Sequence, residues 1–356
     1  MKIVIASCAV ADCGIGRYDE ELTKALHASG EDVTLYRKTP GTVPYIKSYP
    51  YRSFRELRHY VAPYYLSKGI SHENPDIFLA DYVDAGFAIG LSGKKPKAIV
   101  TTAHDAIPFI YKQKPVDFWF YKFQLAKTLK ISDSIVVVSQ KSKDDFVFYT
   151  GCSPERVQVI YNGINHKFFY PDLVRKPNSI FTIRYVGGLS KHKNVEVIIR
   201  TAKILQDRNI PVKFELGGGY PQSTPLPALA TELGLRNVEF KGFIPDSELR
   251  SFLAGADLFV YPSLYEGFGF PPLEAMACGT PVIASGKGSL TEVLRNGAVT
   301  LDPVPEAFAD AIEKIADDTV KWNLLRANGL LVANSYSWGK AASETLGLFQ
   351  SLTGVR

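Results

Sequence analysis

The chain has 356 residues, of which 46% are hydrophobic and 22% are charged, so it is long enough for two globular domains and too apolar to be disordered. Its formal net charge is +5, and the excess lies before residue 168, where there are 22 basic and 17 acidic side chains. This balance suits an anionic ligand or a membrane surface. It is far weaker than the clustered basic stripe of a nucleic-acid-binding protein, so we expect no nucleic-acid partner.

The N-terminal apolar run, residues 1–8, lacks the length and cleavage site of a signal peptide. No later run reaches the ~18 apolar residues of a membrane span. The four cysteines, Cys8, Cys13, Cys152 and Cys278, show no C-x-x-C spacing. We therefore expect a cytoplasmic protein with reduced cysteines and no zinc site.

Two segments each combine an apolar strand, a glycine turn and an amphipathic helix. The first passes from residues 2–8 through Gly14 and Gly16 into a helix that ends at Gly30, and the second from residues 180–186 through Gly187 and Gly188 into a helix. Further strand candidates are residues 98–102, 134–138, 157–160, 212–216, 238–240, 258–260 and 281–284. Because near-continuous apolar strands are typical of buried parallel sheets, the sequence predicts an α/β protein with two doubly wound, Rossmann-like domains.

Turn-forming residues without periodicity occupy 162–165 and 171–177, which indicates the interdomain linker. We predict domains at 1–170 and 171–336. In the first domain, residues 45–65 and 109–123 are rich in aromatic and basic side chains. These aromatics either pack inward or dock an acceptor or an anionic membrane.

The stretch from Tyr265 to Ala284 holds two carboxylates, Glu266 and Glu274. Pro271 and Pro272 suit the first turn of a helix that runs to Gly279, with Glu274 in that first turn. The glycines before it let backbone N–H groups approach a ligand, and a helix N-terminus favours negative charge, so the segment is a candidate cradle for phosphate and sugar oxygens. A carboxylate there is suited to accepting hydrogen bonds from sugar or ribose hydroxyls.

With this E-x7-E motif the chain resembles a GT-B-fold, retaining glycosyltransferase of family four, also called group 1. The other motifs that carry the resemblance are Gly14 to Tyr18, His104-Asp105, Asn162-Gly163, Gly187 to Asn194, Lys241-Gly242-Phe243 and Ser337-Trp338. The resemblance implies two Rossmann-like domains that face a cleft. It also implies that the C-terminal helix, residues 337–352, packs back on the acceptor-binding first domain.

The resemblance implies that the second domain binds a nucleotide-diphospho-sugar. Glu274 would contact the ribose, Glu266 the donor sugar, and Lys193 the diphosphate as its counter-charge. His104, at the carboxyl end of a strand, would face the donor sugar, so the expected catalytic residues are His104, Lys193 and Glu266. The expected donor-binding residues are Gly14, Gly16, Gly188, Gly217, Gly242, Phe243, Gly267, Phe268, Gly269, Phe270, Leu273 and Glu274.

One position departs from the family pattern, because Gly188 stands where an arginine usually follows the first glycine of the loop. Arg17, Lys191 and His192 are the candidates to compensate for the missing cation. The form of this loop resembles the branch rich in mannosyltransferases of polysaccharide assembly. It favours GDP-mannose as the donor, while the acceptor is expected to be a glycan or a lipid-linked glycan.

For this family, retention is usually interpreted as a front-face substitution in which the leaving phosphate helps to deprotonate the acceptor. The sequence has no Asp-x-Asp motif, so we predict no metal or other cofactor. Two alternatives stay open: a GT-B nucleotide-sugar epimerase and a catalytically silent nucleotide-sugar-binding protein. A dehydrogenase is disfavoured because the first loop lacks the third glycine of G-x-G-x-x-G.

Overall fold

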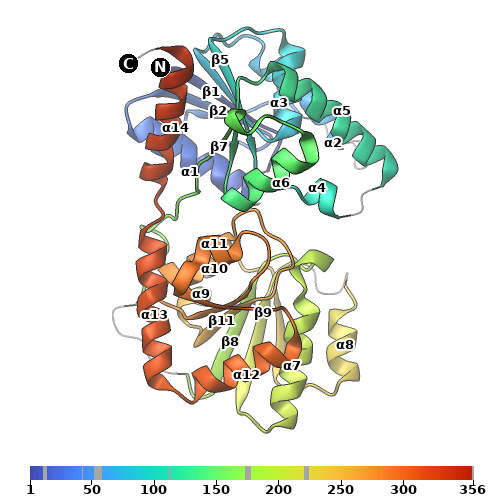
Figure 1. The fold of residues 1–356 in the computed structure, drawn as a ribbon, viewed down its shortest axis with the longest axis vertical. Coiled ribbons are helices and arrows are strands. Elements are labelled where there is room, and N and C mark those ends of the chain that lie inside the picture. The colour runs from blue at the N-terminus through green and yellow to red at the C-terminus, as the bar shows by residue number, and fades with distance from the viewer. Residues whose placement is uncertain are drawn as a thin grey trace. The chain divides into compact units, whose positions relative to one another are not determined.

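A computed structural model of the chain describes residues 1–10, 14–41, 43–51, 58–111, 114–172, 178–219 and 224–354. It contains two compact units, Met1–Gly163 with Trp338–Arg356, and Ile164–Ser337 (Figure 1). The division falls before the predicted boundary at residue 170, because the Ile164 N–H donates to the Tyr336 carbonyl and Ile164 pairs with Ser337. Of the predicted linker, residues 173–177 lie outside the described residues.

The first unit is built on a parallel sheet in the order β3-β2-β1-β4-β5-β6-β7. Its strands are β1 (Lys2–Ser7), β2 (Asp32–Arg37), β3 (Ile46–Ser48), β4 (Ile77–Asp81), β5 (Ala98–Ala103), β6 (Ser134–Val137) and β7 (Val157–Val159). The strand order reverses between β1 and β4. In an open parallel sheet, ligands bind outside the carboxyl ends of the strands at such a switch point.

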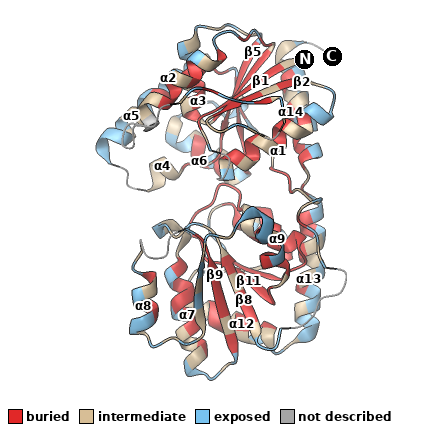
Figure 2. Cartoon of the chain, turned by 180° about the vertical axis from the view of Figure 1, so that it is seen from behind, coloured by how far each residue is buried: buried red, intermediate tan, exposed pale blue. Residues whose placement is uncertain are grey.

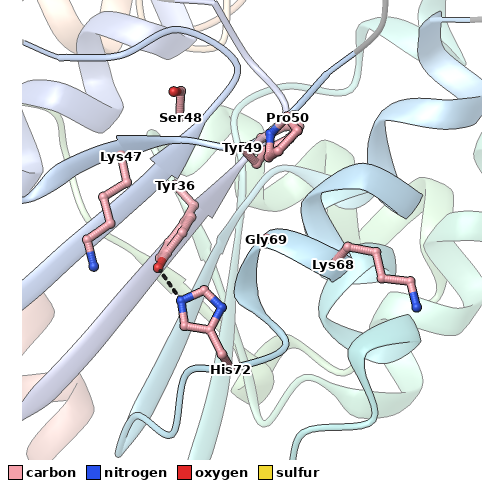
Figure 3. A pocket seen from close by; sticks show the side chains of 8 residues that line it. All are labelled: Tyr36, Lys47, Ser48, Tyr49, Pro50, Lys68, Gly69 and His72. Carbon is pink, nitrogen blue, oxygen red and sulfur yellow. Dashed lines mark hydrogen bonds between the residues drawn. The ribbon is translucent and has the colours of Figure 1, made fainter.

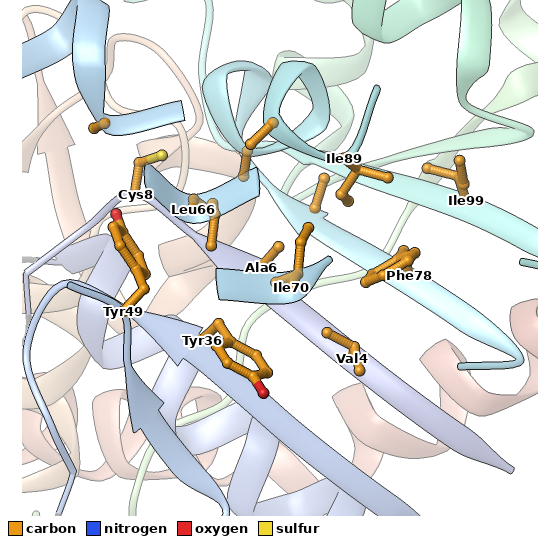
Figure 4. Close-up of a cluster of buried hydrophobic side chains, with 14 residues drawn as sticks. Val4, Ala6, Cys8, Tyr36, Tyr49, Leu66, Ile70, Phe78, Ile89 and Ile99 are labelled. Atoms are coloured by element: carbon orange, nitrogen blue, oxygen red, sulfur yellow. The ribbon is translucent and has the colours of Figure 1, made fainter. Parts of the chain in front are cut away.

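Helices cover both faces of this sheet. The helices are α1 (Gly14–Ala28), α2 (Arg58–Ile70), α3 (Val83–Ser92), α4 (Ile107–Ile110), α5 (Pro115–Ile131), α6 (Gln140–Thr150) and α14 (Trp338–Thr353). Helix α14, which follows the second unit in the chain, packs against α1, whereas α3 packs between α2 and α5. Figure 4 shows the core under α2 and α3, where Val4 and Phe78 of the sheet meet Leu66 and Ile89.

The second unit repeats the design with strand order β10-β9-β8-β11-β12-β13. Its strands are β8 (Phe181–Val186), β9 (Val212–Gly217), β10 (Val238–Gly242), β11 (Leu258–Tyr261), β12 (Val282–Ser285) and β13 (Ala298–Leu301). Its α-helices are α7 (Val195–Asp207), α8 (Leu226–Glu232), α9 (Asp246–Ala254), α10 (Phe270–Ala277), α11 (Leu290–Leu294), α12 (Pro305–Ala316) and α13 (Thr319–Asn334). Here the switch point lies between β8 and β11, and β11 is buried throughout while β8 is buried in part (Figure 2).

The prediction of two doubly wound α/β domains is confirmed. Four strands were not predicted, β2, β3, β4 and β13, and β4 matters most because it ends at Asp81 beside the predicted His104. Cys8, Cys152 and Cys278 are free and buried, and Cys13 lies outside the described residues. Within the described ranges, every helix is too short or too polar to cross a bilayer.

Candidate nucleotide-sugar site

Lys193 and Glu266 meet at the switch point of the second sheet. Lys193 closes the single 3-10 turn η2 (Lys191–Lys193) that follows β8, and Glu266 lies in the loop after β11. The Lys193 Nζ is 2.6 Å from Glu266 Oε1 and 3.1 Å from the Tyr261 hydroxyl oxygen. Both side chains of the pair are largely shielded, with 17% and 11% of their surface exposed. An ammonium and a carboxylate in this setting interact more strongly than an exposed pair.

The Gly187–Gly188 loop is held by two tyrosines beneath it. The rings of Tyr185 and Tyr261 stack with centroids 5.8 Å apart, and the Tyr185 hydroxyl donates to the Gly188 carbonyl oxygen at 2.6 Å. Burial raises the pKa of both phenols, which keeps them neutral donors. The hydrogen bond from the neutral Tyr185 hydroxyl to Gly188 therefore holds the loop that carries Lys193.

Glycines end the strands beside Lys193. Gly217 and Gly242 are the last residues of β9 and β10, and the Gly218 N–H donates to the Gly242 carbonyl at 2.7 Å. A Cβ on Gly218 would lie 1.8 Å from the Gly187 carbonyl oxygen, so only glycine fits. Gly217 and Gly242 were predicted as site residues from the sequence, but Gly218 was not. The close approach of the backbones at Gly187 and Gly218 could have been expected from the two glycine runs in the sequence, Gly187-Gly188 and Gly217-Gly218-Gly219.

Helix α10 begins at Phe270 with Gly269 as its N-cap, whose φ is 95°. Leu290 packs closely against Gly269. A Cβ added at position 269 would lie only 2.6 Å from Leu290 Cδ2. The predicted start at Pro271 is one residue late, and Glu274 is the fifth helical residue, so its placement in the first turn is wrong. The reason is that Phe270 already has helical geometry before the two prolines. Glu274 and Leu273 are both buried in α10.

The chain around Glu266 is held by the loop after β12. The Ser289 N–H and hydroxyl donate to the Glu266 carbonyl oxygen at 3.2 Å and 3.0 Å. A Cβ on Gly288 would lie 2.7 Å from the Glu266 nitrogen, in a backbone with φ +62°. Three loops, after β8, β11 and β12, thus fix the Lys193–Glu266 pair.

The remaining predicted donor-binding positions differ in exposure. Gly267 and Phe268 are buried, and the Phe268 ring packs edge-on against Phe270 and Tyr336. Phe243, just past β10, is 63% exposed. The Phe268 ring is therefore part of the packing under the loop, and contact of this segment with a donor stays a prediction.

Of the candidate cations that could replace the missing arginine, His192 is the weakest. Burial and the neighbouring Lys193 ammonium lower the pKa of His192, so its imidazole is neutral at pH 7. Lys191 is exposed in the same turn. Arg17 belongs to the other unit.

His104 lies at the carboxyl end of β5 in the first unit, as predicted. Its Nε2 is 2.6 Å from Asp81 Oδ1, and the ring contacts Tyr18 edge-on at 4.7 Å and Tyr82 face-on at 6.4 Å between centroids. Burial lowers the pKa of His104, so the ring is neutral at pH 7. The contact with Asp81 occupies Nε2, which leaves Nδ1 as the other polar atom of the ring.

A second carboxyl, which the sequence motifs did not indicate, lies beneath this histidine. Asp19 of α1 is fully buried, and neither of its carboxyl oxygens has a hydrogen-bond donor in the described part of the chain. Its neighbour is the carboxyl of Asp81. Burial raises the pKa of Asp19 well above its usual range and that of Asp81 to about 8, so both carboxyls favour the protonated form at pH 7. Asp19 lies at helical spacing from Leu22 and Leu26, so the sequence pattern alone could have placed its carboxyl on the buried face of α1.

The predicted loop glycines of the first unit lie at the start of α1. A Cβ on Gly14 would meet no atom within 4 Å, so packing does not require glycine there. Gly16 is buried in the first turn. Their predicted contact with the donor stays a prediction.

The first aromatic and basic segment divides between core and surface. Tyr49 is buried, whereas Tyr64 is 55% exposed, and Arg52 and Arg55 lie outside the described residues. Figure 3 shows an open pocket of about 610 Å³ in which Tyr36, Lys47, Lys68 and His72 are among the lining side chains. The Tyr36 hydroxyl and His72 Nε2 are 3.1 Å apart there. This pocket is cationic.

The second segment forms α4 and α5 and divides in the same way. Gln124 and Leu125 are buried, whereas Val116 and Trp119 are each 65% exposed and Phe123 is 39% exposed. Lys112 lies outside the described residues. Phe109 and Tyr121 of this segment pack against a buried cluster, whereas docking of an acceptor or a membrane by the exposed face stays a prediction.

The comparisons with known proteins agree with this geometry. A family model described as "Glycosyl transferases group 1" matches residues 171–331, and one described as "Glycosyltransferase Family 4" matches residues 13–168. Together they span nearly all of both units. The chain has the GT-B fold and belongs to the group 1 glycosyltransferases.

Two curated relatives illustrate the likeness in sequence. The chain is 30% identical over 240 residues to D-inositol 3-phosphate glycosyltransferase 1 of Catenulispora acidiphila, covering 62% of this chain and 57% of that protein. It is 32% identical over 217 residues to the O-antigen chain mannosyltransferase RfbU of Salmonella typhimurium, covering 60% of each. The chain thus spans about 60% of the length of the curated relatives it matches.

Solved structures share the fold at lower identity. A sucrose-phosphate synthase from Thermosynechococcus elongatus matches with a TM-score of 0.84 and 22% identity over 100% of both chains. HepE of Anabaena, in complex with UDP and glucose, matches with a TM-score of 0.80 and 19% identity over 99% of this chain and 100% of that one.

Proposed function

We propose that this protein is a retaining glycosyltransferase that moves a hexose from a nucleotide-diphospho-sugar to a glycan or lipid-linked glycan. The observation that carries the proposal is the shielded Lys193–Glu266 pair at the switch point of the second sheet. The glycine-ended strands and the N-terminus of α10 surround it with backbone N–H groups suited to phosphate and sugar oxygens.

Lys193 would serve as the counter-charge to the donor diphosphate. As the bond between the anomeric carbon and the phosphate oxygen breaks, negative charge grows on the leaving diphosphate, and a fixed ammonium stabilises it. The acceptor hydroxyl oxygen forms the new bond on the same face of the sugar, and its proton passes to the leaving phosphate oxygen. Glu266 would accept hydrogen bonds from sugar hydroxyls, and His104 Nδ1 would form a hydrogen bond with one of them, so that both hold the sugar ring in place.

Mannose from GDP-mannose is our proposal for the donor. It is supported by the form of the Gly187–Asn194 loop and by the likeness to the Salmonella mannosyltransferase. Radiolabelled GDP-mannose, UDP-glucose and UDP-galactose, each incubated with a membrane and glycan extract, test it. We expect label from GDP-mannose in glycan or lipid, and none with Glu266→Gln. Label from a different donor would overturn the choice of mannose, whereas nucleotide release without any transfer would favour the epimerase.

We also propose that transfer needs no metal, because Lys193 and the helix N-terminus supply the positive charge that a cation would otherwise give. Activity unchanged in EDTA is the expected result. Loss in EDTA with recovery on adding Mg²⁺ or Mn²⁺ would contradict it.

Peripheral contact with an anionic membrane is proposed for the outer face of α5. Val116 and Trp119 expose apolar surface there, and the Lys122 and Lys127 ammonium groups lie on the same helix. Flotation with vesicles rich in phosphatidylglycerol tests this contact. We expect binding at low salt that a Trp119→Ser variant loses, and failure of the wild type to float would refute it.

A further inference from the structure

A second cavity lies in the first unit next to His104 and differs in chemistry from the pocket in Figure 3. Its volume is about 280 Å³, close to the ~300 Å³ at which small-ligand sites begin. Tyr60 of α2, Tyr82 before α3 and Tyr121 of α5 are among its aromatic lining residues. Helices α2 and α5 flank α3, so this wall is formed by three adjoining elements (Figure 1).

Among the described residues that line this cavity, the polar side chains are Asp84, Asp117 and Gln124, apart from the tyrosine hydroxyls, and none is a lysine, arginine or histidine. Carboxylate and amide oxygens between aromatic rings suit the hydroxyls and the apolar face of an uncharged sugar. The same carboxylates would repel a phosphate. The pocket of Figure 3, with Lys47 and Lys68, has the opposite preference.

Gln124 supplies an independent indication of a ligand. Its side chain is 95% buried, with 5% of the residue exposed, and its Nε2 has no hydrogen-bond partner among the described residues. A buried amide donor without an acceptor is costly, and a ligand hydroxyl oxygen would satisfy it.

Tyr82 joins the cavity to His104. Its ring lies 6.4 Å from that of His104 at an interplanar angle of 26°, and 6.3 Å from that of Tyr121. The Tyr82 backbone has a φ of 78°, a strained conformation for a residue with a side chain. Such strain persists where the surroundings impose it and is enriched at ligand sites. The ring is thus held between the predicted catalytic histidine and the cavity.

We propose that this cavity binds an uncharged sugar ring of the acceptor, stacked on Tyr82 and Tyr121 and hydrogen-bonded to Asp117 and Gln124. The inference rests on the proposed function and adds to it the chemical class of the acceptor. A phosphorylated or otherwise anionic sugar is excluded from this subsite by Asp84 and Asp117.

Saturation-transfer NMR of the full chain with methyl α-mannoside, methyl α-glucoside and methyl α-galactoside tests the proposal, with mannose 6-phosphate as the charged comparison. We expect at least one neutral glycoside to bind and the phosphate not to bind. Gln124→Leu should weaken binding about threefold to tenfold, the cost of one neutral hydrogen bond. The matched control is Gln140→Leu, an exposed glutamine on α6 that should bind as the wild type does.

Gln124→Leu removes an unpaired buried amide, so it should fold and melt at or above the wild-type temperature. Absence of glycoside binding to the wild type, equal binding by Gln124→Leu, or preference for mannose 6-phosphate would each overturn the proposal. Titration of GDP and UDP into the same samples separates this failure from failure of the proposed function. Nucleotide binding without glycoside binding refutes the subsite alone, whereas loss of nucleotide binding refutes the transferase.

Discussion

Lys193 and Glu266 stand 73 residues apart in the sequence, yet their side chains form a 2.6 Å ion pair between the loops that follow β8 and β11. Each is the charge partner of the other, and the Tyr261 hydroxyl accepts a further hydrogen bond from Lys193. Removing one partner leaves the other shielded from water without a counter-charge, which is more destabilising than removing both.

Lys193→Met should therefore lower both stability and activity. We expect its melting temperature to fall below that of the double variant Lys193→Met with Glu266→Gln, because the double variant buries no lone charge. Its kcat should fall about a hundredfold to a thousandfold, as when a preorganised electrostatic group is removed. Thermal melts and transfer rates of the two single variants and the double variant measure both effects. A double variant whose loss of stability equals the sum of the two single losses would show that the pair carries no coupling.

Glu274→Gln should weaken nucleotide binding while leaving the fold intact. If Glu274 accepts ribose hydroxyls, losing its charge should raise the Kd for GDP or UDP about tenfold or more, the range of a charge-assisted hydrogen bond. Calorimetric titration gives the Kd. Glu248→Gln, an exposed acid on α9, is the matched control and should bind as the wild type. An unchanged Kd for Glu274→Gln would remove the carboxylate from the donor site.

Gly188→Arg should be tolerated and should tighten binding of the donor. A Cβ at Gly188 would meet only Ser190 Oγ, at 3.9 Å, and Tyr185 hydrogen-bonds the Gly188 carbonyl, which the substitution keeps. The added guanidinium would supply the cation that the family usually has here. We predict that the Kd for GDP or UDP falls by about tenfold, which corresponds to the free energy of one charge-assisted hydrogen bond. A variant that folds but binds nucleotide no better would mean that Lys191 or Arg17 already fills this role.

The Asp19–Asp81 pair predicts how stability depends on pH. The folded-state pKa of Asp81 is about 8, against ~3.9 in an unfolded chain, so the folded state holds its proton more tightly. The stabilisation that this proton gives is complete below pH ~3.9 and is lost as the pH rises through about 8. Burial likewise raises the pKa of Asp84, which adds to the trend, whereas His104 is already neutral above pH 7.

Asp19→Asn tests this account. The variant removes one titrating carboxyl and gives Asp81 an amide donor, so it should lose less stability than the wild type between pH 7 and pH 9. Urea denaturation at several pH values in that range compares the two slopes, and comparing variant with wild type cancels the titration of the buried thiols. Parallel slopes would mean that the titration of Asp19 and Asp81 does not set the pH dependence of stability.

Much of the architecture could be predicted from apolar periodicity and turn chemistry. The strands that flank the two glycine loops were found because Val, Ile and Leu dominate them, and α10 was found from Pro271, Pro272 and Gly279. The strand at Ile77–Asp81 was not predicted, because its four apolar residues follow Pro75 and Asp76 and lead into polar residues without a glycine turn. Local sequence carries little information about a short central strand that its neighbours stabilise.

The catalytic candidates could be recognised, but their partners could not. His104 was predicted at the end of a strand, whereas Asp81 and Asp19 lie 23 and 85 residues before it. Only the sheet order, with β4 beside β1 and β5, brings the three together. In the same way, the Lys193–Glu266 contact depends on β8 pairing with β11, which the spacing of residues does not reveal.

Calorimetric titration measures whether the second unit binds a nucleotide diphosphate at the Lys193–Glu266 pair. GDP, UDP, ADP and TDP would be titrated into the wild type and into the variant that combines Lys193→Met with Glu266→Gln. We predict saturable binding of one nucleotide by the wild type and at least tenfold weaker binding by the double variant. Failure of all four nucleotides to bind the wild type, or equal binding by both proteins, would contradict the account.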